Sequence, residues 1–305
     1  MAVQARLTHT DVTPAEDVRP DPAADPARYG LVQLGRKQPL GEYLRDLWDH
    51  RELARSIPAT EFRAENTETV LGNVWHVLDP LVHVAVFWLI FGQILGTDRG
   101  IDNFLLYLAA GMFTFFYTKK SVLSGARAIT SNEKMVRSIS FPRAILPIAA
   151  VSSKLLALGP ALVIVFSIAL FTGERPDPSW LTIPFAFAML TAFNMGIAFV
   201  LARVSDHFPD IQNILPYMLR IWMYLSGVFY AFEGRFGDRV VYGVNAAKVA
   251  LANPMVHFLS AVRTPLLEHR VAPWYTWAAV IGVGTLTLVG GFLFFRQREH
   301  HYGRG

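Results

Sequence analysis

Six apolar runs, each long enough to cross a bilayer, constrain most strongly what this chain can fold into. A spanning helix needs about 20 mostly apolar residues. Its backbone amides must bond within the helix, because hydrocarbon holds no water to bind them. We therefore predict an all-α integral membrane protein with six transmembrane helices, near residues 74–95, 104–123, 144–171, 180–203, 211–232 and 275–295.

Composition supports a membrane protein and excludes several kinds of site. Of 305 residues, 52% are hydrophobic and 17% are charged, which is too apolar for an ordinary soluble domain. The lack of cysteine excludes disulfides, thiolate metal sites and cysteine nucleophiles. A pI near 9.4 is typical of a membrane chain that keeps basic residues on its cytoplasmic side. We therefore expect membrane lipids, and not nucleic acid, as partners.

Basic residues crowd the second connection between spans, whereas the first and third carry only Arg99 and Arg175. Because such residues are retained in the cytoplasm, the second connection is expected there. Five basic residues in the fifth connection argue weakly against this, and those of the tail and the carboxy terminus outweigh them. A multi-pass protein of the cytoplasmic (inner) membrane with both termini cytoplasmic follows. The basic residues of the second connection are Lys119, Lys120, Arg127, Lys134, Arg137 and Arg143.

The segments outside the spans differ in character. Residues 1–35 are rich in Pro, Asp and Ala and predict a disordered cytoplasmic tail without a signal peptide. Residues 36–73 contain an amphipathic helix over 43–57 that Pro58 ends; it lies either in the headgroup plane or on another protein surface. The transmembrane domain is 74–295, and 296–305 form a cytoplasmic tail. The apolar face of the amphipathic helix carries Leu44, Leu47, Trp48, Ala54 and Ile57.

Between the fifth and sixth spans, residues 233–262 hold apolar stretches that are too short to cross the membrane. They are interrupted at Asn253-Pro254. The pattern predicts short re-entrant helices on the outer side, which enter the outer leaflet and return.

Several strings, in one order along 44–299, resemble a single family. LGNVWHVLDPL carries Leu71, Gly72, Trp75 and Pro80, and a Phe-Gly pair follows at Phe91 and Gly92. The family is the membrane permease (Wzm-type) of ABC exporters for O-antigen, teichoic acid and related polysaccharides. Two features depart from its pattern: the Arg-Asp turn is stretched to ARVSDHFPD, and Asp79 stands where a neutral polar residue is expected. The other matching strings are YLAAGMFTFFY, SNEKMVRSISFPRAILP, SGVFYAFE, ANPM with the later Arg263, and FFRQRE.

The resemblance implies a homodimer of six-span subunits, each docked on an ABC ATPase subunit, that moves a polyprenyl-linked polysaccharide outward. The chain holds no G-x-x-x-x-G-K-[ST] phosphate loop, so we expect ATP and Mg²⁺ on the partner, no bound cofactor or metal here, and no enzyme activity. Ala- and Arg-rich usage and the Pro-Asp tail suggest a high-GC bacterium and, with it, an actinobacterial cell-wall galactan as cargo. The resemblance implies an O-antigen-like glycan as the other possible cargo. The alternatives are an exporter of a small drug or lipid and a membrane-embedded glycosyltransferase.

Two polar stripes are predicted to line a water-filled substrate channel, where aromatic faces stack on sugar rings. Both repeat at helical spacing, and such a stripe is not expected to face lipid. The alternative is that Asp79 and Arg220 form a buried ion pair that fixes helix register. The first stripe is Asn73, His76, Asp79 and His83; the second is Asn213, Tyr217, Arg220 and Tyr224, with Tyr230 near its outer end.

Coupling to the ATPase is predicted in the second connection, where Pro142 and Pro147 restrict the backbone around Arg143. The alternative is that its basic residues bind anionic headgroups. Lys154 is expected to snorkel at the inner interface. Asp206, His207 and Asp210 are interpreted as a hydrated turn and not as a metal site. The coupling residues are Asn132, Glu133, Lys134, Met135, Arg137, Phe141, Pro142 and Arg143; an outer gate is predicted at Phe236, Tyr242, Asn253 and Pro254.

Overall fold

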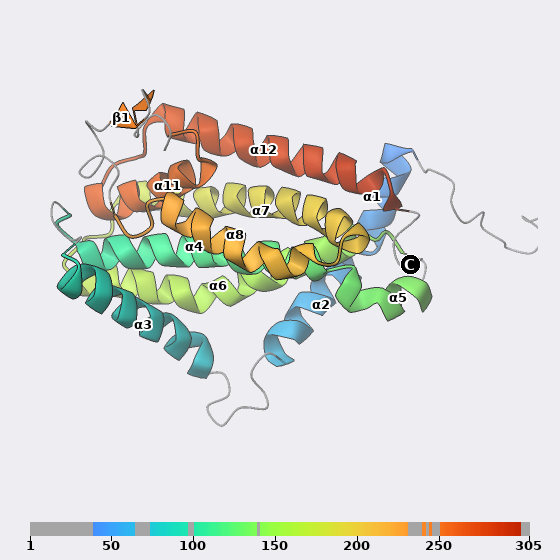
Figure 1. Cartoon of the computed structure of the whole chain (residues 1–305), viewed down its shortest axis with the longest axis horizontal. Helices are drawn as coiled ribbons and strands as arrows, with labels where there is room; N and C mark the ends of the chain where they lie inside the picture. Colours follow the sequence, from blue (N-terminus) through green and yellow to red (C-terminus); the bar gives the residue numbers. More distant parts are fainter. Residues whose placement is uncertain are drawn as a thin grey trace, which may run out of the picture. The chain divides into compact units, whose positions relative to one another are not determined.

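Helices make up nearly all of the architecture in the computed structural model of the chain (Figure 1). The predicted tail, 1–35, and the site residues Asn73, Phe236 and Tyr242 lie outside the described residues. The elements belong to one unit, Leu40–Gly305. The structure describes residues 39–64, 74–96, 101–138, 141–230, 240–241, 244–245 and 251–299.

Each of the six apolar runs contains a helix. Four helical segments are long and apolar enough to cross a membrane: Val77–Ile94, Ile145–Phe171, Pro178–His207 and Trp274–Arg296. The chain is therefore a multi-pass membrane protein. The long helices are α3 (Trp75–Phe87) with the π-helix η3 (Trp88–Ile94), α4 (Phe104–Arg127), α6 (Ile145–Phe171), α7 (Thr182–His207), α8 (Ile211–Leu225) and α12 (Trp274–Arg296).

Shorter elements lie at the two ends of the long helices. Helices α1, α2 and α5 and the carboxy-terminal end of α12 gather at one end, while α11 lies toward the other (Figure 1). The short elements are α1 (Leu40–Asp49), α2 (Arg51–Ala64), η4 (Thr130–Asn132), α5 (Glu133–Ser138), η5 (Pro178–Leu181), β1 (Val240–Val241), β2 (Val244–Asn245) and α11 (Pro254–Glu268).

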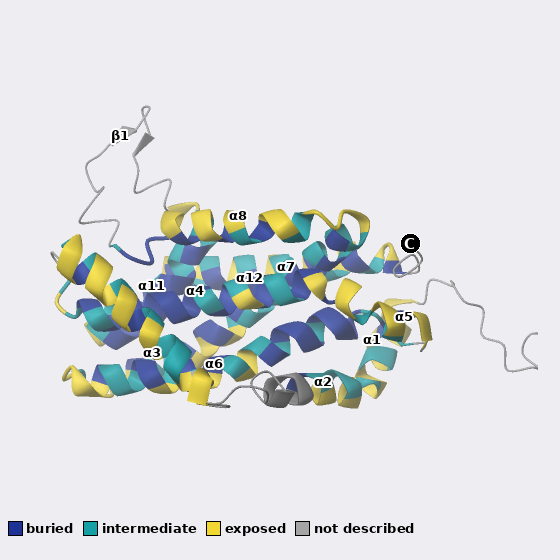
Figure 2. Ribbon diagram, turned by 60° about the horizontal axis from the view of Figure 1, so that its bottom comes forward, coloured by how far each residue is buried: buried dark blue, intermediate teal, exposed yellow. Residues whose placement is uncertain are grey.

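Helix α4 is the central helix of the core, and most of it is buried in Figure 2. It packs against α6, α7, α8 and α11. Two of its buried hydroxyls bond to the preceding turn: Thr114 donates to the carbonyl of Ala110 at 2.7 Å, and Thr118 to that of Thr114 at 3.3 Å. Because these polar groups are satisfied within the helix, α4 can be surrounded on all sides.

Helices α7 and α12 approach closely through glycine. A Cβ on Gly196 would lie 2.2 Å from the carbonyl of Thr287, and a Cβ on Gly291 would lie 2.2 Å from the carbonyl oxygen of Gly196. Small residues of this kind let helix backbones meet in a membrane, where packing and not water exclusion holds helices together.

The prediction of one amphipathic helix over 43–57 is wrong, because the helix stops and restarts at His50. His50 Nδ1 lies 2.8 Å from the carbonyl oxygen of Asp46, and Arg51 donates to that of Trp48 at 3.2 Å. These side chains satisfy the last carbonyls of α1 and so end it at Asp49.

Pro58 does not end the second helix, which runs on to Ala64. Proline removes one main-chain bond there, and the packing of α2 against α6 supports the helix through it. The predicted apolar face is also divided. Ile57 and Leu47 pack on a buried cluster, whereas Leu44 and Trp48 are exposed.

The segment between α8 and α11 contains a strand pair where the sequence predicts only helices. Val240 pairs with Asn245 and Val241 with Val244 in antiparallel register. β-Branched valine occupies three of the four positions, which favours extended backbone over helix. The predicted break at Asn253-Pro254 is confirmed, since α11 begins there.

Candidate functional site

Helix α5 carries much of the predicted coupling segment. Its outer face is charged: Arg137 pairs with Glu133, four residues earlier, and Lys134 is exposed. Its inner face is held by Met135 and Val136, which belong to the cluster of buried residues around Ala144 and Phe199. A short charged helix is therefore fixed firmly to the ends of the long helices.

The corner that follows α5 is joined to both ends of the described chain. Glu299, just beyond α12, accepts hydrogen bonds from the backbone N–H of Arg143 at 2.7 Å and from the hydroxyl of Tyr43 at 2.8 Å. The Arg143 guanidinium also donates to the Glu299 carbonyl. The sequence reasoning assigned no role to Tyr43 or Glu299. Glu299 ends the family-matching string FFRQRE and Tyr43 begins the predicted amphipathic helix, but neither pattern signals that the two residues meet.

Burial sets the protonation of this cluster. Glu299 is 8% exposed, and the loss of hydration raises the pKa of its carboxyl above its usual value, although the donors Tyr43 and Arg143 oppose the shift. Burial and the neighbouring Glu299 raise the pKa of Tyr43 as well, so its hydroxyl remains a donor at physiological pH.

The remaining coupling residues stiffen the same region. The amide of Asn132 donates to the carbonyl of Ala128 at 2.9 Å, and Phe141 packs against the buried cluster that holds α5. The carbonyl of Pro142 accepts from the amide of Ile145 at 3.1 Å, which starts the first turn of α6. The predicted rigid corner is thus tied to α4, α5 and α6.

The first polar stripe lies on α3. Asp79 contacts His83 at 3.2 Å and the ammonium of Lys120 on α4 at 3.9 Å; all three side chains are substantially exposed. The predicted ion pair with Arg220 is not formed within the described chain, because Lys120 takes that place beside Asp79. His76 also belongs to α3.

The second polar stripe occupies one exposed face of α8. Its four members alternate with exposed apolar residues, while the opposite face carries the buried Leu215, Leu219 and Met223. Arg220 lies close enough to Lys119 of α4 to repel it electrostatically. The two stripes therefore flank the Lys119-Lys120 pair. The four members are Asn213, Tyr217, Arg220 and Tyr224.

Three phenylalanines join the far ends of α3 and α8. The ring of Phe229 stacks on those of Phe87 and Phe91 at centroid distances of 5.0 and 4.4 Å. Tyr230 folds back, and its hydroxyl donates to the carbonyl of Tyr224 at 2.8 Å. This stack lies at the end of the helices that is away from α5.

Asn253 fastens α11 to the end of α8. Its side-chain oxygen caps α11 through the amide of Met255 and accepts from the indole of Trp222, both at 3.0 Å. Its amide nitrogen donates to Ser226 Oγ at 3.0 Å. Pro254 occupies the first position of the helix, where its missing N–H costs nothing.

Arg263 on α11 is a buried cation that the sequence reasoning noted without a role. Its guanidinium donates to the carbonyls of Tyr107 at 3.1 Å, Gly227 at 3.0 Å and Val228 at 2.7 Å. It also lies 3.5 Å from the Tyr107 ring centroid. Gly111 makes room for it, since a Cβ there would lie 1.9 Å from Nη2. Arg263 thus joins α4, α11 and the turn that follows α8.

Comparison with known proteins agrees with these features. The family model for the ABC-2 type transporter matches residues 61–267. The O-antigen export system permease protein RfbA of Myxococcus xanthus is 24% identical over 260 residues, covering 85% of this chain and 97% of its own length.

Two further relatives match shorter parts of this chain. A Klebsiella pneumoniae RfbA permease is 22% identical over 57% of this chain and 67% of its own length. The polysialic acid transport protein KpsM of Escherichia coli is 22% identical over 78% of this chain and 90% of its own length. Since the family model covers most of the chain, this protein belongs to the ABC-2 type transporter family.

Proposed function

We propose that this chain is the transmembrane subunit of an ABC exporter that moves a polyprenyl-linked polysaccharide across the cytoplasmic membrane. The observation that carries the proposal is the similarity, along 97% and 90% of their lengths, to permeases named for O-antigen export and polysialic acid transport. An O-antigen-like glycan or a cell-wall galactan is the proposed cargo.

Energy comes from two separate ABC ATPase subunits, which bind ATP and Mg²⁺; this chain binds no cofactor itself. Its sequence contains no phosphate loop. Helix α5 is proposed to receive the conformational change of the ATPase subunit, because its charged face is exposed while Met135 and Val136 anchor it. The hydrogen bonds among Tyr43, Arg143 and Glu299 then pass this change to α1, α6 and α12 together.

Two copies of the chain enclose the conduit in this proposal. The exposed faces of α3 and α8 carry Asp79, His83 and Arg220, and Lys120 of α4 lies beside Asp79. A charge facing hydrocarbon costs about 2.5–3.5 kcal/mol or more. These faces therefore turn toward water and the second copy, where Tyr217 and Tyr224 offer stacking surfaces to sugar rings.

The proposed topology has six spans with both termini cytoplasmic. Helices α4 and α8 complete the set, although α4 carries two lysines and α8 is only 15 residues long. α11 is also 15 residues long and largely buried, as suits a re-entrant outer helix. Asn253 and Pro254, which hold it to α8, form the base of the outer gate.

Depletion of the protein in its native host tests the proposal. Lipid-linked glycans are then quantified on each side of the cytoplasmic membrane, with and without a plasmid-borne copy of the gene. We expect a finished polyprenyl-linked polymer to accumulate inside and to disappear when the copy is expressed. The same extracts identify the glycan.

Two results would favour the alternatives. Loss of the polymer without internal accumulation points to a membrane-embedded glycosyltransferase. Unchanged glycans on both sides, with altered efflux of a small drug or lipid, point to a small-molecule exporter.

A further inference from the structure

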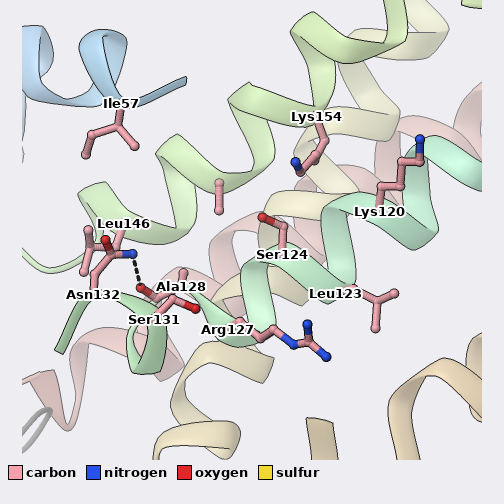
Figure 3. Close-up of a pocket in the computed structure, with 11 residues that line it drawn as sticks. Ile57, Lys120, Leu123, Ser124, Arg127, Ala128, Ser131, Asn132, Leu146 and Lys154 are labelled. Carbon is pink, nitrogen blue, oxygen red and sulfur yellow. Dashed lines mark hydrogen bonds between the residues drawn. The ribbon is translucent and has the colours of Figure 1, made fainter. Parts of the chain in front are cut away.

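A cavity of about 360 Å³ lies between α2, α4 and α6 (Figure 3). It is near the α5 end of the helices and separate from the exposed stripe of α8. Its volume falls within the range of ordinary small-ligand sites. The described residues that line it are Ile57, Lys120, Leu123, Ser124, Arg127, Ala128, Ser131, Asn132, Leu146, Ala150 and Lys154.

The polar lining of this cavity suits an anion. It contains three basic side chains, Lys120, Arg127 and Lys154, and none of the described lining residues is acidic. The hydroxyls of Ser124 and Ser131 add further donors. Figure 3 shows Lys154 extending from α6 toward Ser124 on α4. Arginine and lysine beside hydroxyls are typical of phosphate recognition.

The position of the cavity suits a group at a membrane interface. Its apolar wall includes Ile57 of the amphipathic helix α2 and Leu146 near the start of α6. Lys120 also lies 3.9 Å from Asp79, on the α3 stripe that we propose lines the conduit. Lys120 therefore lines the cavity and also lies beside that stripe.

From this arrangement we infer that the cavity binds the diphosphate group by which the polyprenyl carrier is joined to its glycan. The inference rests on the proposed function and assigns a receiving site to its substrate. The two phosphates lie among Arg127, Lys154 and Lys120, and the apolar wall receives the first part of the polyprenyl chain. Lys120 then sits where the head group leaves the cavity for the Asp79 stripe.

Binding of defined lipids to the purified chain in nanodiscs tests this inference without ATP or the partner subunit. The probe is a polyprenyl diphosphate without sugar, and its dissociation constant is measured for the wild type and for Arg127→Gln/Lys154→Gln. We expect the double variant to bind at least about tenfold more weakly, because charge-assisted hydrogen bonds are lost. Lys154→Arg keeps the charge and should retain most of the affinity that the separate variant Lys154→Gln loses.

Lys119→Gln is the matched control, since Lys119 neighbours Lys120 on α4 but does not line the cavity. It should bind the probe as the wild type does. Thermal unfolding of every variant in the same nanodiscs separates lost binding from lost folding.

Phosphatidylglycerol, added as a competitor, separates the two sources of a lipid phosphate. Weak competition supports the diphosphate assignment, whereas equal competition shows a general site for anionic headgroups and overturns it. Folded Arg127→Gln/Lys154→Gln protein with wild-type affinity also overturns it. Neither outcome affects the export proposal, which the depletion experiment tests separately.

Discussion

Glu299 accepts a hydrogen bond from the hydroxyl of Tyr43 at 2.8 Å, across 256 residues of chain. The same carboxyl oxygen accepts from the backbone of Arg143. The amphipathic helix α1, the corner after α5 and the end of α12 therefore meet at one buried group. We therefore expect a displacement of any of them to be transmitted to the other two.

We predict that Glu299 makes the stability of the protein depend on pH. Burial raises the pKa of its carboxyl in the folded state above the ordinary 4.5. The contribution of Glu299 to the stability of the fold is therefore complete below pH 4.5, its ordinary pKa. This contribution is lost as the pH rises through the raised folded-state pKa. Between about pH 4 and pH 8, the melting temperature of the wild type should fall relative to that of Glu299→Gln. A constant difference would contradict the assignment.

Removing the Tyr43 hydroxyl should weaken the same cluster. Tyr43→Phe keeps the ring beside Phe292 and should cost about 1 kcal/mol of unfolding free energy. Tyr275→Phe is the control, because Tyr275 is about half exposed. Equal denaturation midpoints for the two variants would show that the buried bond contributes nothing measurable.

Gly111→Ala should expel Arg263 from its site. The added Cβ meets the guanidinium, and the carbonyls of Gly227 and Val228 then lose their donor. Buried bonds to a charged group are each worth about 1.5–3 kcal/mol, so little folded protein should remain. Gly282→Ala, where a Cβ meets nothing within 4 Å, should behave as the wild type. Size-exclusion profiles in detergent compare the two.

The adjacent glycines of α12 provide a second matched pair. Gly291→Ala places a Cβ 2.2 Å from the carbonyl oxygen of Gly196 and should force α7 and α12 apart. The free energy of unfolding should fall by roughly several kcal/mol. Gly290→Ala points into open space and should be neutral. Thermal melts that fail to distinguish the two variants would be inconsistent with the described α7–α12 contact.

Charge reversal on α5 should uncouple the ATPase. Lys134→Glu/Arg137→Glu changes the exposed face and leaves Met135 and Val136 anchored. We expect the ATPase subunit to co-purify much less with this variant than with Arg55→Glu, which alters another exposed basic residue, on α2. Unchanged co-purification would favour the alternative that these residues bind anionic headgroups.

The sequence predicts the features that depend on local pattern. Apolar length locates all six long helices, and helical spacing predicts that Tyr217 and Tyr224 share a face of α8. Spacing fixes a face but not the neighbour across from it. For this reason the sequence pairs Asp79 with Arg220, while the fold brings Lys120 to it.

Features that depend on distant contacts could not be predicted in the same way. The acceptors of Arg263 are backbone carbonyls, which leave no residue signature, and they come from two distant segments. Pro58 signals a helix end, yet the packing of α2 against α6 supports the helix beyond it. All six long helices lie between Tyr43 and Glu299 in the sequence, so no local pattern signals that the two meet.

Export of the lipid-linked glycan into inverted membrane vesicles tests the central claim most directly. The vesicles carry this chain with its ATPase partner and expose their cytoplasmic face, and a glycan-degrading enzyme is added outside. The account predicts that ATP makes the polymer resistant to the enzyme, and that vesicles without this chain show no such protection. Equal protection with and without ATP, or with and without the chain, would contradict it.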